Sequence, residues 1–410
     1  MPKAPQDAPT TGCAIVGGGP AGMMLGLLLA RAGVQVTVLE KHEDFLRDFR
    51  GDTVHASTLR MLDELGLGAR FAEVPHRMIE SLELKVQGVP VQVDLRHLPG
   101  AHQHIALVPQ WDFLELLAAA AAQEPTFTLL RSCEVLGPLM TGSSVSGVRY
   151  RDAAGAIREL RAPLTVACDG RGSTLRDAIG LTPKRFGAPM DVWWFRVPRH
   201  DNDPAGLAGA MGRGHMMAMI DRGDYYQCAF VIPKGSDAAL RAEGIESLYR
   251  RVTDVVPWVA DRIATVASFD DVKLLDVQLD RLPRWYTDGA LIIGDAAHAM
   301  SPVGGVGINL AVADAVAAAR LLADPLRTGS VPAKVLRRVQ IRRWLPTVII
   351  QSVQRMVHNR VIAVAVSGTG PDRPPAAVRL VSRVPMLRRI IGYGVAIGPL
   401  PEHIPAYARR

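Results

Sequence analysis

The spacing of apolar and polar residues changes several times along the chain, and the first change is the most informative. A short apolar run at Cys13–Val16 enters a glycine-rich turn, and residues 23–32 are then apolar on almost every side. A second apolar run at Val34–Leu39 ends at Glu40. Short runs without alternation are typical of strands buried on both faces. The pattern predicts a strand, a buried helix and a parallel strand in one right-handed unit.

The turn after the first strand has the spacing G-x-G-x-x-G, at Gly17, Gly19 and Gly22. In a dinucleotide-binding unit these glycines permit the turn, the approach of a pyrophosphate and the packing of helix on strand. The helix N-terminus adds free N–H groups and partial positive charge for phosphates. Glu40 is placed to accept hydrogen bonds from ribose hydroxyls. The stretch predicts a dinucleotide site without identifying the dinucleotide.

Two later apolar runs open into polar turns that contain glycine. Residues 164–168 lead to Asp169, and residues 290–294 lead to Asp295 and a glycine-rich loop before an apolar helix at 311–322. Ligands of α/β sheets bind at the carboxyl ends of strands. The dinucleotide domain is therefore expected to be discontinuous in the sequence.

Between these motifs, apolar and polar residues alternate. Ser81–Val93 and three aromatic segments between residues 190 and 286 have the period of two that predicts an antiparallel sheet with one covered face. Asp112 is expected to cap an Ala-rich helix. The predicted parts are a cofactor domain made of residues 12–78, 103–180 and 276–330, a substrate-binding sheet domain made of 79–102 and 181–275, and a helical C-terminal region, 331–410.

The composition is that of a globular protein with more than one domain. Its 410 residues are 48% hydrophobic and 21% charged. The four cysteines are scattered, which argues against a disulfide framework or a metal site and fits the cytoplasm. No apolar signal segment precedes the first strand, and no uninterrupted apolar run reaches about 20 residues.

The net charge of +7 conceals a basic C-terminal region. From Arg320 onward, sixteen Lys and Arg residues stand against three acidic residues, so the rest of the chain is net negative. No nucleic-acid recognition module accompanies this region, and nucleic-acid binding is not expected. The arginines are interpreted either as solvating a helical face and pairing with the acidic body, or as a contact with a membrane surface or an acidic carrier.

Three motifs, GGGPAG with Glu40, CDGRGSTLR and GDAAHAMSPVGGVGINLAVADA, closely resemble those of the FAD monooxygenases of the para-hydroxybenzoate hydroxylase type. Their order and spacing match over about residues 12–325. The resemblance implies an α/β fold with a Rossmann-like FAD-binding domain, an inserted antiparallel-sheet domain and a C-terminal helical region. It also implies FAD as cofactor and NADPH or NADH and O2 as co-substrates, without a separate nicotinamide domain. We expect a monomer or a homodimer.

The same resemblance implies the FAD contacts. The first motif would bind the ADP half, the second would approach FAD and the nicotinamide donor, and the third would bind the ribityl chain and wrap the isoalloxazine. Arg171 and Arg176 are expected to fix the second motif by ion pairs, and His298 to be structural. The implied FAD-binding residues are Gly17, Gly19, Gly22, Glu40, Lys41, Arg50, Gln110, Val135, Asp169, Gly294, Asp295, Pro302, Gly305, Gly307, Ile308 and Asn309.

The implied activity is hydroxylation of a mostly apolar aromatic or phenolic substrate through a C4a-hydroperoxyflavin. The substrate is expected between the flavin and the antiparallel sheet, and a histidine there could activate a phenol as a base. The candidate catalytic residues are His55, His215, Arg213 and Pro302. The expected lining residues of the substrate pocket are His55, Trp194, Arg196, Met211, Arg213, His215, Met217, Met219 and Tyr226.

Three other interpretations share these motifs. A flavoprotein of the same fold could catalyse a cyclisation or a reduction without oxygen transfer. A flavin halogenase is suggested by Trp193–Pro198, but Phe195 departs from the W-x-W-x-I-P pattern and the segment has the alternation of a strand. A non-catalytic flavin-binding protein is the third.

Overall fold

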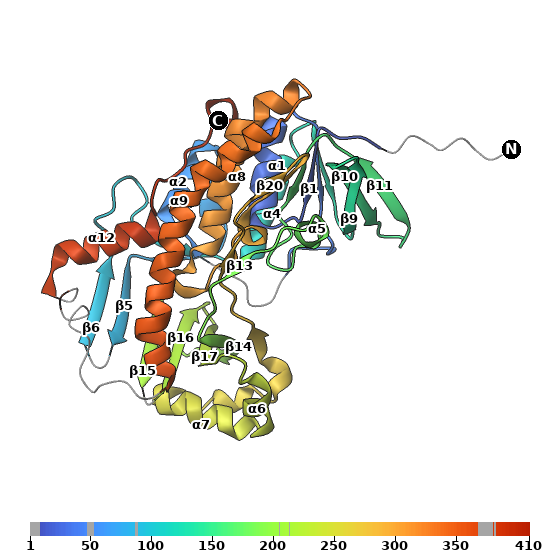
Figure 1. The fold of residues 1–410 in the computed structure, drawn as a ribbon. Coiled ribbons are helices and arrows are strands. Elements are labelled where there is room, and N and C mark those ends of the chain that lie inside the picture. The colour runs from blue at the N-terminus through green and yellow to red at the C-terminus, as the bar shows by residue number, and fades with distance from the viewer. Residues whose placement is uncertain are drawn as a thin grey trace.

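A computed structural model describes residues 9–46, 53–86, 89–204, 206–212, 214–367, 380 and 383–410. Two predicted site residues, Arg50 and Arg213, lie outside the described residues. Two large sheets, linked by a long C-terminal helix, form the body of the protein (Figure 1).

The first large sheet has six strands in the order β20-β21-β12-β1-β2-β8, and all pairs except β20–β21 are parallel. Its central strands are buried along their whole length, as their uninterrupted apolar sequences predict. The strands are β1 (Cys13–Val16), β2 (Val36–Leu39), β8 (Phe127–Leu130), β12 (Thr165–Ala167), β20 (Tyr286–Thr287) and β21 (Ala290–Ile292).

Three apolar helices cover one face of this sheet and share one core with it. They are α1 (Pro20–Arg31), α4 (Gln110–Ala121) and α8 (Gly307–Arg327). The prediction that Asp112 caps α4 is wrong, because the helix begins at Gln110 and the residue before it is Pro109. The helical segment Val303–Arg327 is long and apolar enough to cross a membrane, but 78% of its most apolar window is buried inside the protein, as in a core helix.

The other face of the sheet packs against a smaller antiparallel sheet and a short helix. These elements are β9 (Glu134–Thr141), β10 (Ser144–Arg151), β11 (Ile157–Arg161) and α5 (Thr174–Ala178). The connections between the large sheets contain β3 (Thr53–Val54), α2 (Ala56–Glu64), α3 (Gly68–Ala72), β4 (Arg77–Ile79), β7 (Ile105–Leu107), β13 (Lys184–Arg185) and β19 (Asp280–Arg281).

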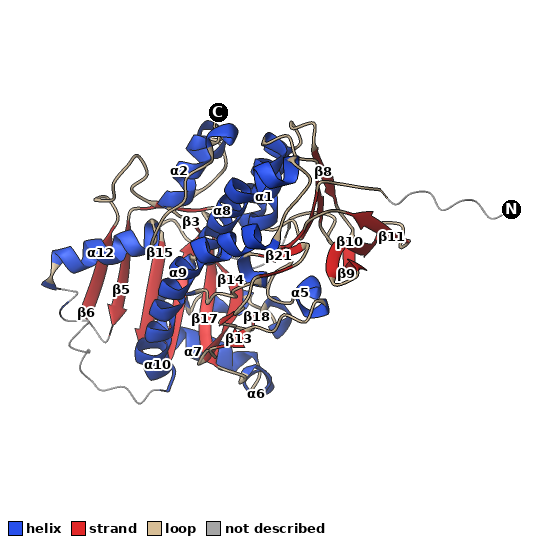
Figure 2. Ribbon diagram, turned by 45° about the horizontal axis from the view of Figure 1, so that its top comes forward, coloured by secondary structure: helices blue, strands red, loops and turns tan. Residues whose placement is uncertain are grey.

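The second large sheet has seven strands in the order β18-β14-β17-β16-β15-β5-β6. One face forms a core with α7 (Ile245–Val255), and the other faces the C-terminal helices (Figure 2). The short helix α6 (Asp237–Ala242) precedes α7. The strands are β5 (Ser81–Val86), β6 (Val89–Asp94), β14 (Met190–Pro198), β15 (Leu207–Gly212), β16 (His215–Asp221), β17 (Tyr225–Pro233) and β18 (Lys273–Leu275).

The C-terminal region packs against both parts of the molecule. Helix α9 (Ala333–Val357) lies on α8 and continues through a π-helical turn, His358–Ile362, into α10 (Ala363–Ser367), which contacts β16 and β17. Helix α12 (Pro385–Ala396) packs on β6. The last residues return to α1, where Arg31 Nη1 donates to the Ala408 carbonyl at 2.7 Å.

Candidate functional site

The predicted cofactor motifs converge at one edge of the six-stranded sheet. Strands β21, β12, β1 and β2 are neighbours and run in the same direction, so their carboxyl ends meet. These ends lead to Asp295, Asp169, the Gly17–Gly22 turn and Glu40, respectively. A ligand at this edge would therefore contact four segments that are far apart in the sequence.

The glycine turn has space for a ligand at one position and none at two others. Gly17 has φ +97°, and a Cβ there would lie 2.6 Å from the Cys168 carbonyl oxygen. A Cβ on Gly22 would lie 2.0 Å from the Gly17 carbonyl oxygen. A Cβ on Gly19 would meet no atom within 4 Å. The turn thus packs tightly against β12 and α1 and leaves open space at Gly19, which fits an approaching pyrophosphate.

Glu40 is held beside this turn with its carboxylate fixed by backbone donors. Its Oε2 accepts from Gly18 N at 2.8 Å, and its Oε1 accepts from His42 N at 3.0 Å. A carboxylate has about four acceptor positions, so these two bonds are compatible with hydrogen bonds from ribose hydroxyls. Lys41 is exposed next to it, and Val135 packs in the core that contains Leu39. Gln110 is the first residue of α4 and is half-buried.

Asp169 is half-buried, and one of its carboxylate oxygens is buried with unused acceptor capacity. Its Oδ2 accepts from Leu175 N at 3.4 Å, whereas Oδ1 has no hydrogen-bond partner within the described residues. Burial raises the pKa of this carboxyl above its usual value. An unpartnered buried oxygen at the shared strand edge suits a hydroxyl donor from a bound cofactor.

Two arginines connect the Asp169 turn with the Asp295 turn. Arg171 Nη2 lies 3.6 Å from Asp295 Oδ2. Arg176 is buried, and its Nη1 donates to the Ala296 carbonyl at 3.2 Å. Arg171 thus forms an ion pair, as expected, whereas Arg176 reaches the Asp295 turn by a hydrogen bond to a carbonyl and pairs with its neighbour Asp177.

A buried ionic cluster supports the Gly294–Asp295 turn from behind. Asp314 Oδ2 accepts from Gly294 N at 3.1 Å and lies 2.5 Å from His298 Nε2, and Oδ1 accepts from Arg343 Nε at 2.8 Å. Burial alone would raise the pKa of Asp314, but His298 and Arg343 together hold it below its usual value. His298 thus has the structural position that was expected for it.

The loop from Pro302 to Asn309 is tied to the start of α2. Thr53 Oγ1 donates to the Gly305 carbonyl at 2.7 Å, and Asn309 Nδ2 donates to the Thr53 carbonyl at 3.1 Å. Asn309 Oδ1 accepts from His55 N at 2.8 Å and from Thr58 Oγ1 at 2.7 Å. Helix α8 begins within this loop at Gly307, so its first N–H groups, including that of Ile308, lack intrahelical partners and can stabilise negative charge.

His55 is fully buried and uncharged. Its Nδ1 lies 2.7 Å from the Val395 carbonyl, which can only accept, so Nδ1 carries the proton. Burial lowers the pKa to about 4. This low pKa makes His55 a weak base near neutral pH, and its catalytic role stays a prediction.

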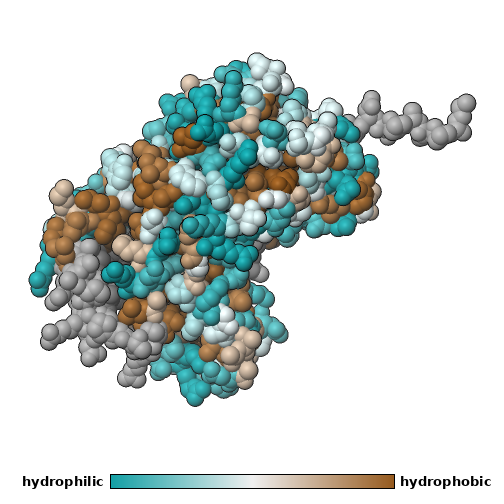
Figure 3. Space-filling view, viewed as in Figure 1, coloured by the Kyte–Doolittle hydropathy of each residue, from teal (hydrophilic) through white to brown (hydrophobic). Residues whose placement is uncertain are grey.

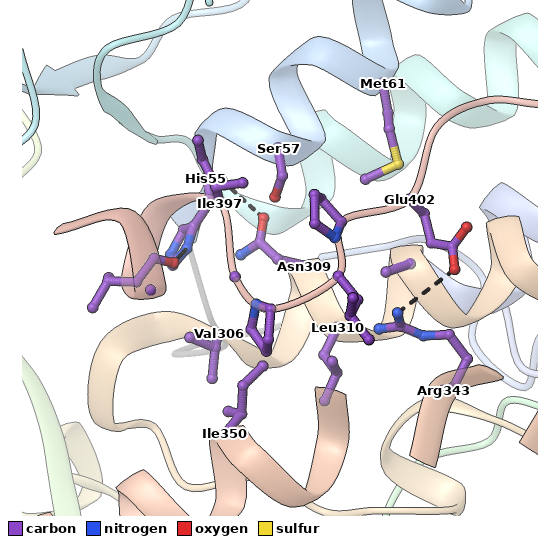
Figure 4. Close-up of a pocket in the computed structure, with 17 residues that line it drawn as sticks. His55, Ser57, Met61, Val306, Asn309, Leu310, Arg343, Ile350, Ile397 and Glu402 are labelled. Carbon is purple, nitrogen blue, oxygen red and sulfur yellow. Dashed lines mark hydrogen bonds and ion pairs between the residues drawn. The ribbon is translucent and has the colours of Figure 1, made fainter. Parts of the chain in front are cut away.

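His55 lines a small cavity with Asn309 and the segment Gly394–Glu402 (Figure 4). The cavity has a volume of about 40 Å³, which is enough for one or two water molecules and too small for an aromatic substrate. We therefore do not assign the substrate to this cavity.

A more suitable wall lies on the face of the second sheet that meets the loop from Pro302 to Asn309. Trp194, Met216 and Val231 point to this face and pack in a cluster with Val303 of the loop. Met211 pairs with Met216 across two strands and so shares their face. Trp194 Nε1 is buried and has no hydrogen-bond partner within the described residues.

Four of the residues predicted to line the substrate pocket lie on the opposite face of the sheet. Met217, Met219 and Tyr226 are buried in the core with α7, and the His215 ring lies 5.6 Å from Phe230 in that same layer. Neighbouring residues of a strand point to opposite sides, so these four side chains point away from the loop. Their assignment to the substrate pocket, including the catalytic role of His215, is corrected by this geometry.

Arg196 also lies outside this cluster. Its guanidinium lies 5.1 Å from the centre of the Tyr225 ring, and its side chain is exposed.

The contribution of α9 to the site was not predicted. Gln354 Nε2 donates to the Ser301 and Val303 carbonyls at 3.0 and 2.9 Å, and His358 Nε2 lies 2.7 Å from Ser301 Oγ. The sequence does contain a signal, because polar residues recur every three or four positions from Arg343 to His358, as on one face of a helix.

Comparisons with known proteins agree with this geometry. A family model described as FAD binding domain matches residues 10–344. The chain is 34% identical over 401 residues to a 6-methylpretetramide 4-monooxygenase of Streptomyces rimosus, with 96% of this chain and 94% of that protein covered.

Solved structures show the same fold. P. aeruginosa PqsL in complex with 2-aminobenzoylacetate has a TM-score of 0.74 and 23% identity, with 88% of this chain and 98% of that chain covered. The Diels-Alderase PyrE3 has a TM-score of 0.74 and 19% identity, with 95% and 80% covered.

Proposed function

The chain belongs to the FAD-binding family that contains the para-hydroxybenzoate hydroxylase-type aromatic monooxygenases, and from this premise we propose that it hydroxylates a mostly apolar, polycyclic aromatic or phenolic substrate. It is an FAD-dependent monooxygenase, and we propose NAD(P)H and O2 as its co-substrates, as is typical of this class. The 34% identity with an enzyme named for 6-methylpretetramide supports this substrate class.

The residues of the strand edge suit the FAD that the family implies. We assign the pyrophosphate to the open space at Gly19 and a ribose to Glu40. Asp169 and Asp295 would accept hydrogen bonds from hydroxyl groups of the cofactor. The N-terminus of α8 would stabilise the negative charge of the reduced ring. When bound, FAD accepts the hydride and activates O2, while the protein binds, orients and excludes water.

The observation that carries the substrate proposal is the apolar wall opposite the flavin-binding loop. Trp194, Met211 and Met216 provide a surface for an aromatic ring system, and methionine adapts to irregular shapes. The indole Nε1 of Trp194 is a donor without a partner within the described residues, which suits a carbonyl or phenolate oxygen of the substrate. We propose Trp194 as the residue that orients the substrate.

The proposal is tested with purified enzyme, NADPH or NADH, and a panel of polycyclic phenols under 18O2. We expect phenol-stimulated NAD(P)H oxidation and one 18O atom in the product. A product without 18O would instead identify a cyclisation or reduction, and the absence of stimulation by any aromatic would contradict the proposal.

Trp194 is tested separately with Trp194→Phe and, as a matched control, Trp258→Phe, since Trp258 packs on Tyr226 away from the loop. Loss of one hydrogen bond should raise KM about three- to tenfold. Equal KM values for the two variants would remove Trp194 from the proposal.

A further inference from the structure

Helix α9 has an unusual distribution of polar and apolar side chains. Most of the residues that its C-terminal half and the following turn bury are polar: Arg343, Thr347, Gln351, Gln354 and His358. Its solvent-facing side carries a row of apolar side chains that are between 39% and 59% exposed, beside the exposed polar residues Arg337, Arg338, Arg342, Ser352 and Arg355. We call this set the apolar ridge; it consists of Ile341, Leu345, Ile349, Val353 and Met356. A helix that only covers a protein core has the opposite arrangement.

The apolar ridge forms one continuous strip. Its members are separated by four, four, four and three residues, so they share one side of the helix. From Ile341 to Met356 the helix rises by fifteen steps, which extend over about 22 Å. Arg338 precedes the strip by three residues and Arg360 follows it by four, and both are exposed. Within the described residues, neither arginine forms an ion pair.

Helix α12 adds a second exposed apolar surface. Met386 is 70% exposed and Ile390 is 56% exposed. Arg389 is exposed on the same helix, and the exposed Arg383 lies just before it. Figure 3 shows apolar surface over α12 and along α9 on the same face of the molecule, with hydrophilic atoms between and around it. Such a combination of apolar area and arginines is typical of a binding surface.

The charged residues near the apolar ridge indicate which kind of partner this surface binds. The sequence has no acidic residue between positions 325 and 371, so the helix offers no negative charge to a second copy. An antiparallel pair of α9 helices centred on Ile349 would place Arg338 opposite Arg360, which is repulsive. The partner must therefore be both apolar and anionic.

We propose that the apolar ridge and α12 dock on an anionic lipid bilayer surface. The apolar side chains would enter the boundary between headgroups and acyl chains, and the arginines would contact lipid phosphates. The ridge carries almost no hydrogen-bonding group, which suits an acyl surface better than a folded acidic protein. Buried polar residues on the other side keep α9 anchored to the protein, so the helix lies on the membrane and does not cross it. This inference is independent of the proposed substrate.

The proposal is tested by flotation of the FAD-loaded enzyme with vesicles. We expect binding to phosphatidylcholine vesicles that contain phosphatidylglycerol, weaker binding without it, and release as salt is raised. Leu345→Glu/Val353→Glu should reduce binding at least tenfold. Arg338→Gln and Arg360→Gln should each reduce it about fivefold.

The matched control is Ile157→Glu, which changes an exposed apolar residue on β11 and should bind vesicles as the unmodified enzyme does. Flavin absorbance and the melting temperature show that each variant is folded. Unchanged vesicle binding by Leu345→Glu/Val353→Glu would overturn the proposal, as would no binding to anionic vesicles. A dimer that this double variant converts to a monomer would assign the ridge to a second copy instead and also overturn it.

Discussion

Arg343 Nε donates to Asp314 Oδ1 at 2.8 Å, and the two side chains are 2% and 0% exposed. The same aspartate accepts from the backbone N of Gly294, directly before Asp295. Arg343 also lies 3.8 Å from the buried Glu402. The C-terminal region therefore helps to hold a turn that we assign to the cofactor, although the two lie far apart in the sequence.

Replacing Arg343 should destabilise the protein and weaken FAD binding. Arg343→Met leaves the buried Asp314 with His298 as its remaining side-chain partner, and breaking a buried pair costs about 3–5 kcal/mol. Urea unfolding and the flavin-to-protein ratio measure the two effects. Arg337→Met is the control, because Arg337 is exposed on the same helix and its loss should cost less than about 0.5 kcal/mol. Equal unfolding free energies for the two variants would contradict this account of the cluster.

Gly19 and Gly22 should respond differently to a side chain. A Cβ on Gly19 meets no protein atom, and its φ of −75° suits any residue, so Gly19→Val should fold but fail to bind FAD. A Cβ on Gly22 would lie 2.0 Å from a carbonyl oxygen. Gly22→Ala should therefore lower the free energy of unfolding by about 3 kcal/mol or more. Thermal unfolding of the FAD-free proteins and titration with FAD separate the two effects. Normal FAD affinity in Gly19→Val would place the pyrophosphate elsewhere.

His55 should make the protein less stable in acid. Burial lowers its pKa from 6.5 to about 4, so between these values the unfolded chain binds a proton that the folded protein does not. The neutral imidazole therefore contributes fully to the free energy of unfolding above pH 6.5, and this contribution is lost as the pH falls toward 4. The difference corresponds to about 3 kcal/mol. Unfolding free energies across this range should fall less steeply for His55→Asn than for the unmodified enzyme; parallel curves would show that His55 is not the titrating group.

The glycine turn and the order of the motifs were predictable because they depend on local spacing. Glycines at 17, 19 and 22 between an apolar strand and an apolar helix allow few other structures. The position of the cofactor motifs at the carboxyl ends of the strands was predictable for the same reason, because each motif comes directly after a buried apolar run. Comparison with known proteins confirmed the family, the FAD cofactor and the fold.

The faces of the second sheet were not predictable from alternation alone. Met216 and Met217 are adjacent and both apolar, and each face of the sheet is covered, one by α7 and the other by the loop and α9. Alternation therefore predicts a strand, but it does not show which of the two alternating sets of side chains faces the site. The burial of the polar side of α9 was not predictable either, because its residues become buried only through contacts with Ser301, Asp280 and Asp314, which lie in other segments.

Asn309 should affect the reaction more than cofactor binding. Asn309→Leu keeps the side-chain size but leaves His55 N and Thr58 Oγ1 without their acceptor, which costs about 1–3 kcal/mol for each buried group. The Gly17–Glu40 contacts are untouched, so FAD should remain bound. The loosened loop should misplace the ring relative to the substrate wall and lower the rate of product formation about tenfold or more.

The measurement for Asn309→Leu is the ratio of hydroxylated product and of hydrogen peroxide to NAD(P)H consumed. We expect a shift from product to peroxide at an unchanged flavin-to-protein ratio. Thr58→Val is the matched control, because it removes one of the same hydrogen bonds and leaves Asn309 bonded to Thr53 and His55. Its coupling should lie between that of the unmodified enzyme and that of Asn309→Leu. Loss of FAD from Asn309→Leu would instead mean that the loop contributes mainly to cofactor affinity.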